Sequence, residues 1–297
     1  MQIGFNSRFL TEMLTNLQSD MIMSPHVVVI PLYRTELSIQ EQYSIRTTAS
    51  ILARHDIFIV GPHKLAEYLE ELASQFGKKL QYKTFDDSFF ANIDGYNKLL
   101  VSELFYRSFE AYRYMLIAQT DALVFKDELE LWVGKGFSYI GAPWFEGFTT
   151  PTLPLKLTSV GNGGYSLRNI AHFLKVLRRP TIFKNVLMES WPGSFVSNTY
   201  RFLKDYHSFI YKNTQINLNV NEDVFWGLFV APRCSFFKVP TALEAVAFAF
   251  EAHPEVLYQL NHQQLPFGCH AWERYAQEFW LDTLNQHGYD ISAIKPQ

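Results

Sequence analysis

The chain has 297 residues, of which 48% are hydrophobic and 16% aromatic, and its 26 Lys and Arg against 29 Asp and Glu give a formal charge of −3. A chain of this length and apolar content buries about 70–75% of its unfolded surface, which excludes disordered, collagen-like and disulfide-scaffold proteins. The near-neutral charge provides no general attraction to a polyanion, so we do not expect nucleic acid as a partner. Two cysteines, Cys234 and Cys269, are too few for a disulfide framework and favour a reducing compartment.

Residues 1–25 are predicted to be an N-terminal extension that precedes the folded domain. Asn, Gln and Glu interrupt this segment before an apolar run develops, so it lacks the centre of a signal peptide and we expect a cytoplasmic protein. The longest apolar stretches, such as Val27–Pro31 and Ala245–Phe250, are far shorter than the roughly 20 residues that span a bilayer. Any membrane association is therefore expected to be peripheral.

Short apolar runs alternate with amphipathic segments in the first part of the chain. We predict strands at Val27–Leu32, Asp56–Val60 and Leu80–Phe85, separated by helices at Ser38–Arg54 and Lys64–Phe76. This β-α-β-α-β order predicts an α/β domain whose parallel sheet is covered by helices.

The alternation continues in the middle of the chain. We predict a helix at Tyr96–Tyr112, a strand at Tyr114–Ala118, a helix near Asp127–Val133, a strand at Phe137–Ile140 and a helix at Arg168–Leu177. The polar and aromatic stretch that then runs to Asn221 is expected to be a binding loop or lid, because structureless loops of that length are rarely passive connectors.

Asp121 follows the apolar strand Tyr114–Ala118 and precedes another apolar run. In open α/β sheets, ligands collect just outside the carboxyl ends of the strands, which makes this a candidate ligand site. A carboxylate between buried residues needs a partner. It either holds a divalent cation that bridges a diphosphate or caps a turn, and the segment alone leaves both interpretations open.

A glycine cluster places Gly161, Gly163 and Gly164 directly before the predicted helix that begins at Arg168. Without Cβ atoms, such a loop lets its amides approach a sugar or phosphate near a helix N-terminus. A plain tight turn accounts for the same pattern and is favoured by the local sequence.

Glu222 and Asp223 open an apolar helical segment, where the helix dipole favours carboxylates; capping is enough to explain one of them and is the interpretation that the local sequence favours. Alternatively, one carboxylate points into a cleft as a general base and the other orients it. Later in the chain, His270 lies between a glycine turn and an aromatic residue. It is either a structural histidine or a metal ligand on the opposite side of the cleft from Asp121.

The motifs occur in an order that resembles uncharacterised bacterial and fungal domains assigned to GT-A-type glycosyltransferases. The resemblance covers most of the chain and rests on VVVIPLY (27–33), FDDSFF (85–90), GYNKLLVSELFY (95–106), YMLIAQTDALVFKDELELW (114–132), FSYIGAPW (137–144), VGNGGYSLR (160–168), NEDVFW (221–226) and PFGCHAW (266–272). It implies a single GT-A-like, Rossmann-type α/β domain over residues 26–290, with a mostly parallel sheet flanked by helices. The implied nucleotide-binding half covers about 26–145, and the half for donor sugar and acceptor covers about 146–290.

More distantly, the chain is similar to inverting galactosyl- and N-acetylglucosaminyltransferases, in which a helix carrying Asn and Lys precedes a strand that ends in an Asp-x-Asp metal motif. The resemblance places Asn97 and Lys98 on that helix, beside the nucleotide, and Asp121 at the second acid of the metal motif. The first acid is replaced by Gln119, an amide, which is a departure from the pattern.

The same resemblance implies the remaining site residues. Asn162, Gly163 and Gly164 are expected to line the donor sugar, and His270 stands where these relatives have a late metal-binding histidine. Apart from the resemblance, Trp144 and Trp226 are candidate sugar platforms because an aromatic face can stack on the apolar face of a pyranose, with core packing as the alternative. The acidic pair places the general base on Asp223, with Glu222 beside it.

The implied activity is transfer of a sugar from a nucleotide-sugar donor, expected to be UDP-linked, to a hydroxyl of a glycan or glycolipid acceptor in polysaccharide biosynthesis. Mn²⁺ or Mg²⁺ on Asp121 and His270 would stabilise the leaving diphosphate, and Asp223 would accept the acceptor's proton during inversion. Two other classes stay open: a metal-dependent phosphohydrolase or nucleotidyltransferase, and a non-catalytic carbohydrate-binding domain, which Gln119 in place of an acid would allow.

Overall fold

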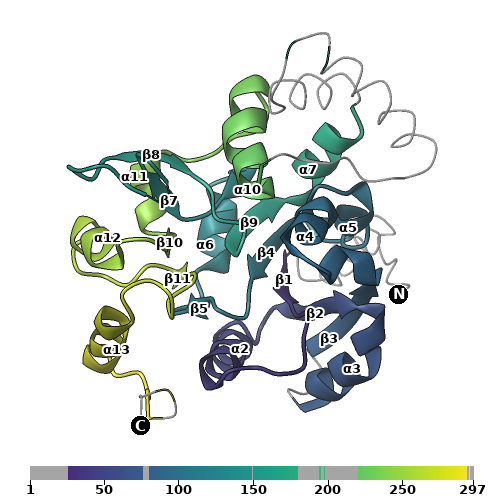
Figure 1. Ribbon diagram of the computed structural model, residues 1–297, viewed down its shortest axis with the longest axis horizontal. Helices are drawn as coiled ribbons and strands as arrows, with labels where there is room; N and C mark the ends of the chain where they lie inside the picture. Colours follow the sequence, from purple (N-terminus) through teal and green to yellow (C-terminus); the bar gives the residue numbers. More distant parts are fainter. Residues whose placement is uncertain are drawn as a thin grey trace, which may run out of the picture.

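The computed structural model describes residues 26–75, 80–148, 150–179, 194, 197, 220–292 and 294. The predicted N-terminal extension, residues 1–25, lies outside these described residues, and so does nearly all of the predicted lid between residues 180 and 219. Figure 1 shows the described part as a layered structure, with β3 and α3 on one side and α12 and α13 on the other.

A six-stranded sheet forms the centre of the molecule, in the order β3-β2-β1-β4-β9-β6. The first four of these strands are parallel, whereas β9 is antiparallel to both β4 and β6. The sheet confirms the predicted α/β class with a mostly parallel, helix-flanked sheet in a single domain. Its strands are β1 (His26–Pro31), β2 (Asp56–Pro62), β3 (Leu80–Phe85), β4 (Tyr114–Ala118), β6 (Tyr139–Ile140) and β9 (Tyr165–Asn169).

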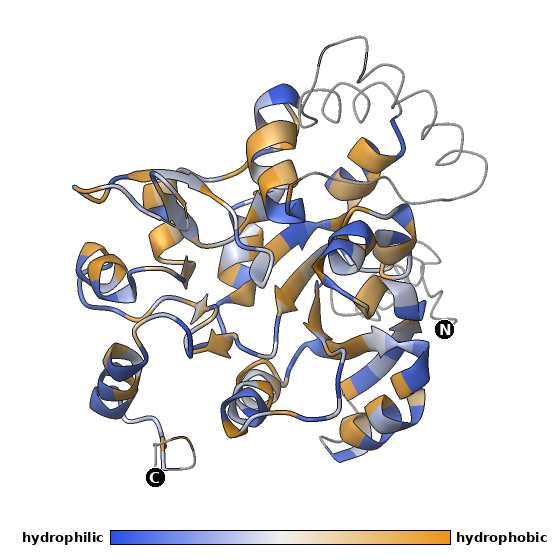
Figure 2. Ribbon diagram, in the orientation of Figure 1, coloured by the Kyte–Doolittle hydropathy of each residue, from blue (hydrophilic) through white to orange (hydrophobic). Residues whose placement is uncertain are grey.

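The central strands are continuously apolar because both faces of the sheet are covered. Val27 and Val29 of β1 point into one hydrophobic cluster, and Val28 and Ile30 point into the other. Figure 2 shows β1 and β4 as hydrophobic, whereas much of β9 is hydrophilic. This contrast explains why the apolar runs in the sequence predict strands β1 and β4 but not β9.

Helices cover the two faces of this sheet. One cluster joins α4, α5, α7 and the helix after residue 221, and the other joins α2, α3, α6 and α11. None of the helices among the described residues is long and apolar enough to cross a bilayer. The helical bounds are α2 (Ile39–Ile51), η1 (His63–Leu65), α3 (Ala66–Gln75), η2 (Asp87–Phe90), α4 (Ile93–Leu100), α5 (Glu103–Arg107), α6 (Leu129–Gly134), α7 (Ile170–Leu177), α10 (Glu222–Val224), the π-helix η3 (Phe225–Val230), η4 (Ala231–Arg233), α11 (Ala242–Val246), α12 (Pro254–Leu260) and α13 (Gln277–Gln286).

Two smaller sheets complete the second half of the chain. A three-stranded sheet has the order β10-β11-β5, and a two-stranded sheet pairs β7 with β8. A third hydrophobic cluster, which includes Trp272 and Trp280, packs around the three-stranded sheet. Its strands are β5 (Leu123–Val124), β10 (Ala249–Phe250) and β11 (Gly268–Cys269), and the two-stranded sheet consists of β7 (Pro143–Phe145) and β8 (Leu157–Val160).

Two of the predicted helices are wrong in their extent. The segment Tyr96–Tyr112 forms α4 and α5 instead of one helix, because the Ser102 hydroxyl accepts a hydrogen bond from the amide of Phe105 and begins a new helix. The helix predicted from Arg168 begins at Ile170, since residues 165–169 pair with β4 as strand β9. The glycine cluster therefore leads into a strand and has no helix N-terminus behind it.

Candidate active site

The first cluster of polar side chains forms where β4 ends. Asp121 follows β4, and the antiparallel pairing of Cys269 with Leu123 brings His270 beside it. The His270 Nε2 atom lies 3.3 Å from Asp121 Oδ1 and 3.2 Å from Gln119 Oε1. The fold thus brings together the two residues predicted to be metal ligands, and adds the amide that replaces the first acid of the motif.

A third carboxylate contacts the other side of the His270 imidazole. The Nδ1 atom lies 3.0 Å from Glu251 Oε1. Burial alone would lower the pKa of His270, but Asp121 and Glu251 outweigh it and raise that pKa to about 10. Burial likewise raises the pKa of Asp121, but the imidazole outweighs it and leaves this pKa below its ordinary value. Without a cation, the cluster is an imidazolium between two carboxylates.

The donor atoms at Asp121, His270 and Gln119 fit a hard divalent cation. In the described part of the chain, no three or more His, Cys, Asp or Glu side chains are grouped to hold a metal. The two side-chain oxygens are nevertheless 3.2 and 3.3 Å from Nε2, close to the roughly 3 Å between neighbouring ligands around Mg²⁺. One carboxylate, one imidazole and one amide oxygen leave further positions for phosphate oxygens and water.

The second cluster centres on an ion pair that the sequence did not reveal. Arg168 of β9 is fully buried, and its two terminal nitrogens lie 3.0 and 2.8 Å from the carboxylate oxygens of Glu222. Burial disfavours the Arg168 cation, but the Glu222 carboxylate outweighs this and raises the pKa of Arg168. The guanidinium also donates to the Tyr106 hydroxyl and to Ser166. Glu222 is therefore held in an internal ion pair next to Asp223, an arrangement suited to orienting its neighbour rather than to contacting a substrate.

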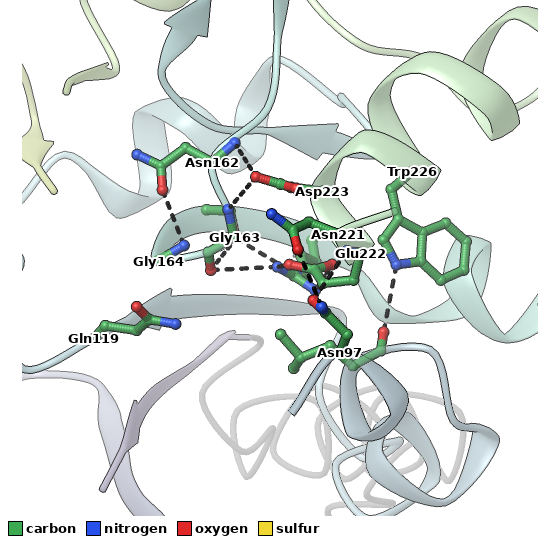
Figure 3. A network of polar contacts seen from close by, with 12 residues as sticks. Asn97, Gln119, Asn162, Gly163, Gly164, Asn221, Glu222, Asp223 and Trp226 are labelled. Atoms are coloured by element: carbon green, nitrogen blue, oxygen red, sulfur yellow. Dashed lines mark hydrogen bonds and ion pairs between the residues drawn. The ribbon is translucent and has the colours of Figure 1, made fainter. Parts of the chain in front are cut away.

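Asp223 has a different environment from its neighbour. It is half-buried, and its Oδ2 atom accepts hydrogen bonds from the amides of Asn162 and Gly163, at 3.2 and 3.3 Å. Figure 3 shows these amides of the glycine loop pointing at the carboxylate. Burial raises the pKa of Asp223 above its ordinary value, although backbone hydrogen bonds oppose the rise. A partly accessible carboxylate with a raised pKa is suited to accept a proton.

The glycine loop joins the two clusters. The Gly164 amide donates to Asn162 Oδ1 at 3.0 Å, and Asn162 has a left-handed backbone with φ of 72°. A Cβ atom on Gly163 would lie 2.1 Å from Glu222 Oε1, and one on Gly164 would lie 2.0 Å from His270 Nε2. The prediction that these two missing Cβ atoms make room for a ligand is therefore wrong, because they make room for the protein's own side chains.

Asn97 and Lys98 lie on α4 but have different surroundings. Asn97 is buried, donates to Asn221 Oδ1 and accepts from the Glu222 amide at 3.1 Å, so it positions the start of α10. Lys98 is half-buried and joins neither cluster through its described contacts.

The two predicted aromatic platforms differ as well. Trp226 is fully buried, donates from its indole nitrogen to the Leu100 carbonyl and stacks on Phe237, so its prediction as a sugar platform is wrong. Trp144 is half-buried on β7, and its ring occupies the place where a Cβ atom of Gly161 would be. It remains a candidate platform next to the glycine loop.

Sequence reasoning missed Arg168, Glu251 and the ligand capacity of Gln119. Arg168 fell within a predicted helix, and its partner is 54 residues further along the chain. The only available signal for Glu251 was its position as the first polar residue after the apolar run Ala245–Phe250.

Solved structures with some likeness to this chain include three sugar transferases. The apo form of mouse xyloside xylosyltransferase 1 is 10% identical with a TM-score of 0.46, covering 82% of this chain and 96% of that one. The glycosyltransferase GlyE of Streptococcus pneumoniae TIGR4 is 11% identical with a TM-score of 0.46, covering 88% and 60%. The galactosyltransferase LgtC, in complex with donor and acceptor sugar analogs, is 10% identical with a TM-score of 0.43, covering 88% and 95%. TM-scores this low assign no function.

The remaining comparisons concern sequence alone. No curated protein sequence matches the chain significantly. The family described as "Protein of unknown function (DUF5672)" matches residues 79–270, which is more than half of the 297 residues, and the chain therefore belongs to that family.

Proposed function

We propose that this protein is a glycosyltransferase that moves a sugar from a nucleotide-sugar donor to an acceptor hydroxyl with inversion at the anomeric carbon. One observation carries the proposal. The loop Asn162–Gly164 contacts Asp223 through the amides of its first two residues and His270 through its third. Adjacent residues of one loop thereby contact both a candidate base and a candidate cation site.

Each cluster would have its own role in the reaction. A divalent cation held by Asp121, His270 and Gln119 would neutralise charge on the departing diphosphate, a contribution of several kcal/mol. Asp223 accepts the proton of the attacking hydroxyl, for which a raised pKa brings it closer to the pH of the reaction. The buried ion pair of Arg168 and Glu222 fixes the start of α10 and so the direction of Asp223.

The substrates are proposed from the sequence resemblance and from two local features. The buried Nδ2 atom of Asn162 has no acceptor within the described structure, and a hydroxyl of the donor sugar would satisfy it. Trp144, next to the loop, is suited to stack on a pyranose. The resemblance adds a UDP-linked donor, a glycan or glycolipid acceptor, Mn²⁺ or Mg²⁺, and a cytoplasmic role in polysaccharide biosynthesis with at most peripheral membrane contact.

Thermal unfolding with a panel of nucleotide sugars, with and without Mn²⁺, tests donor binding. A ligand at about 100 times its dissociation constant adds about 2.7 kcal/mol of stability, which raises the melting temperature of a chain of this size by about 4 °C. A donor that binds is then incubated with candidate acceptors, and the nucleoside diphosphate and the glycoside are quantified. The proposal fails if no nucleotide sugar shifts the melting temperature.

The product distinguishes transfer from the competing activities. Proton NMR of the new glycosidic bond must show a β-linked product from an α-linked donor, because a base-assisted direct displacement inverts the anomeric carbon. Retention of configuration would exclude Asp223 as the base. Release of phosphate or pyrophosphate without an acceptor would instead indicate a phosphohydrolase or nucleotidyltransferase, and binding without turnover would indicate a carbohydrate-binding domain.

A further inference from the structure

The three-stranded sheet places Glu251 beside His270. Strands β10 and β11 are parallel with Phe250 opposite Cys269, so Glu251 and His270 are the next residue on each strand. The His270 amide donates to the Phe250 carbonyl at 3.0 Å, which continues the pairing to this point. On its other side, β11 pairs with β5, the strand that Asp121 precedes. One carboxylate therefore reaches the imidazole from each neighbouring strand.

The two carboxylates are not equivalent. The side chains of Glu251 and His270 are 19% and 15% exposed, whereas that of Asp121 is 39% exposed. Asp121 is thus the more accessible of the two carboxylates, and it contacts Nε2 whereas Glu251 contacts Nδ1. The nitrogen that contacts Asp121, Nε2, is also the one that faces Gln119.

We propose that Glu251 is a positioning residue for the cation site, which holds the His270 ring so that its Nε2 lone pair is directed at the cation. An ionised carboxylate only accepts hydrogen bonds, so Nδ1 must be the donor at their 3.0 Å contact. In a neutral imidazole that leaves Nε2 without a proton and free to bind a metal. Carboxylates behind metal-binding histidines fix the tautomer and the ring orientation in this way.

The His270 ring also packs against Gly164. A Cβ atom there would lie within 2.5 Å of Nε2, Cδ2 and Cε1 of His270, so the backbone of the loop packs over the face of the imidazole at Nε2. The ring therefore has the Gly164 backbone against one face and Glu251 at its Nδ1 edge. This contact couples the cation site to the loop that holds Asp223.

The inference rests on the proposed function only for the presence of a cation, and it is tested with Mn²⁺ alone on the full chain. The concentration of free Mn²⁺ is followed by electron paramagnetic resonance during titration of the parent protein, Glu251→Gln and Glu255→Gln. Glu255 is a matched control because its carboxylate also contacts a histidine, His253 at 3.6 Å, outside the site. We expect Glu251→Gln to weaken Mn²⁺ binding about 10–100-fold and Glu255→Gln to leave it unchanged.

A second measurement does not depend on any variant. Nitrogen-15 NMR of the His270 imidazole in the Mg²⁺-saturated parent protein shows which ring nitrogen carries the proton. We expect the proton on Nδ1 in the parent.

A purely structural role for Glu251, tying β10 to β11, would lower the melting temperature of Glu251→Gln but would leave the Mn²⁺ affinity of the folded protein unchanged.

The outcomes separate this inference from the proposed function. Parental Mn²⁺ affinity in Glu251→Gln, a proton on Nε2 of the parent, or no Mn²⁺ binding by the parent would each overturn the role of Glu251. None of these three results decides whether sugar is transferred, which is measured by its product, although the absence of Mn²⁺ binding would also remove the cation from the proposed reaction. Conversely, Mn²⁺ binding that depends on Glu251 in a protein without donor turnover would overturn the proposed function and leave the positioning role in place.

Discussion

Replacing Glu222 and Asp223 one at a time by their amides tests the different roles that the structure gives to two adjacent carboxylates. Glu222 is 3% exposed and pairs with the fully buried Arg168 through both of its oxygens. Asp223 is half-buried and faces the glycine loop. We expect Glu222→Gln to lose stability and Asp223→Asn to lose transfer.

The size of the stability loss follows from the burial of the ion pair. Removing one partner of a buried pair costs about 3–5 kcal/mol, because the other charge stays buried without compensation. With an unfolding entropy of about 2.1 cal/mol/K per residue, 1 kcal/mol corresponds to about 1.6 °C in a chain of 297 residues. The melting temperature of Glu222→Gln should therefore fall by about 5–8 °C.

The expected behaviour of Asp223→Asn is the opposite. The amide oxygen still accepts from the amides of Asn162 and Gly163, so the loop keeps its anchor. Because the folded-state pKa of Asp223 is raised, its ionised form costs stability at any pH above that pKa, and a neutral amide removes this cost. The melting temperature should be unchanged or slightly higher, whereas transfer falls at least about 10²-fold without its base.

Circular dichroism melts at neutral pH and initial rates well below both melting temperatures measure the two effects separately. Donor affinity of Asp223→Asn should stay close to the parental value, since a general base stabilises the transition state rather than the bound donor. A Glu222→Gln variant that melts with the parent but has lost transfer would move the base role to Glu222. An Asp223→Asn variant that transfers at the parental rate would return Asp223 to helix capping.

Three further predictions concern the cation site, the loop and pH. Asp121→Asn should weaken Mn²⁺-dependent donor binding in calorimetry and lower the melting temperature of the cation-free protein, because the His270 imidazolium loses one of its two carboxylate partners; parental affinity would exclude Asp121 as a ligand. Gly164→Ala should cost about 1–3 kcal/mol and weaken Mn²⁺ binding, because the new Cβ displaces His270, whereas Gly134→Ala has nothing within 4 Å of its Cβ and is the control. The raised pKa of Asp223 predicts that kcat/KM falls on the acid side with a midpoint above 3.8, as the base becomes protonated, and an unchanged acid limb in Asp223→Asn would contradict this assignment.

Local sequence was sufficient for much of the fold. Strands β1 to β4 lie within one or two residues of their predicted ends. For β1, β2 and β4 the reason is that strands buried on both faces must be largely apolar, whereas the edge strand β3 is of mixed polarity. It failed at β9, where Arg168 and Asn169 interrupt the apolar pattern. A buried arginine is tolerated there only because Glu222 pairs with it, and a partner 54 residues away leaves no periodic signal.

Some residues of the candidate site could likewise be located from local sequence, and others could not. Asp121 could be located because the carboxyl end of a parallel strand is a place that the topology alone marks as a ligand site. The order of several motifs along the chain, through its resemblance to a known family, predicted that Asp223 and His270 belong to one site. Local sequence by itself favoured helix capping at residues 222 and 223.

Only the tertiary structure decided what each side chain faces. Consecutive helical residues point about 100° apart, so Glu222 and Asp223 had to diverge, but only the position of Arg168 determined which one is buried. Likewise, the glycine at 164 indicated a close approach, and the fold shows that the approaching group is His270. The identity of a residue limits its chemistry, whereas its partner is set by elements that are distant in the chain and meet only when the sheets assemble.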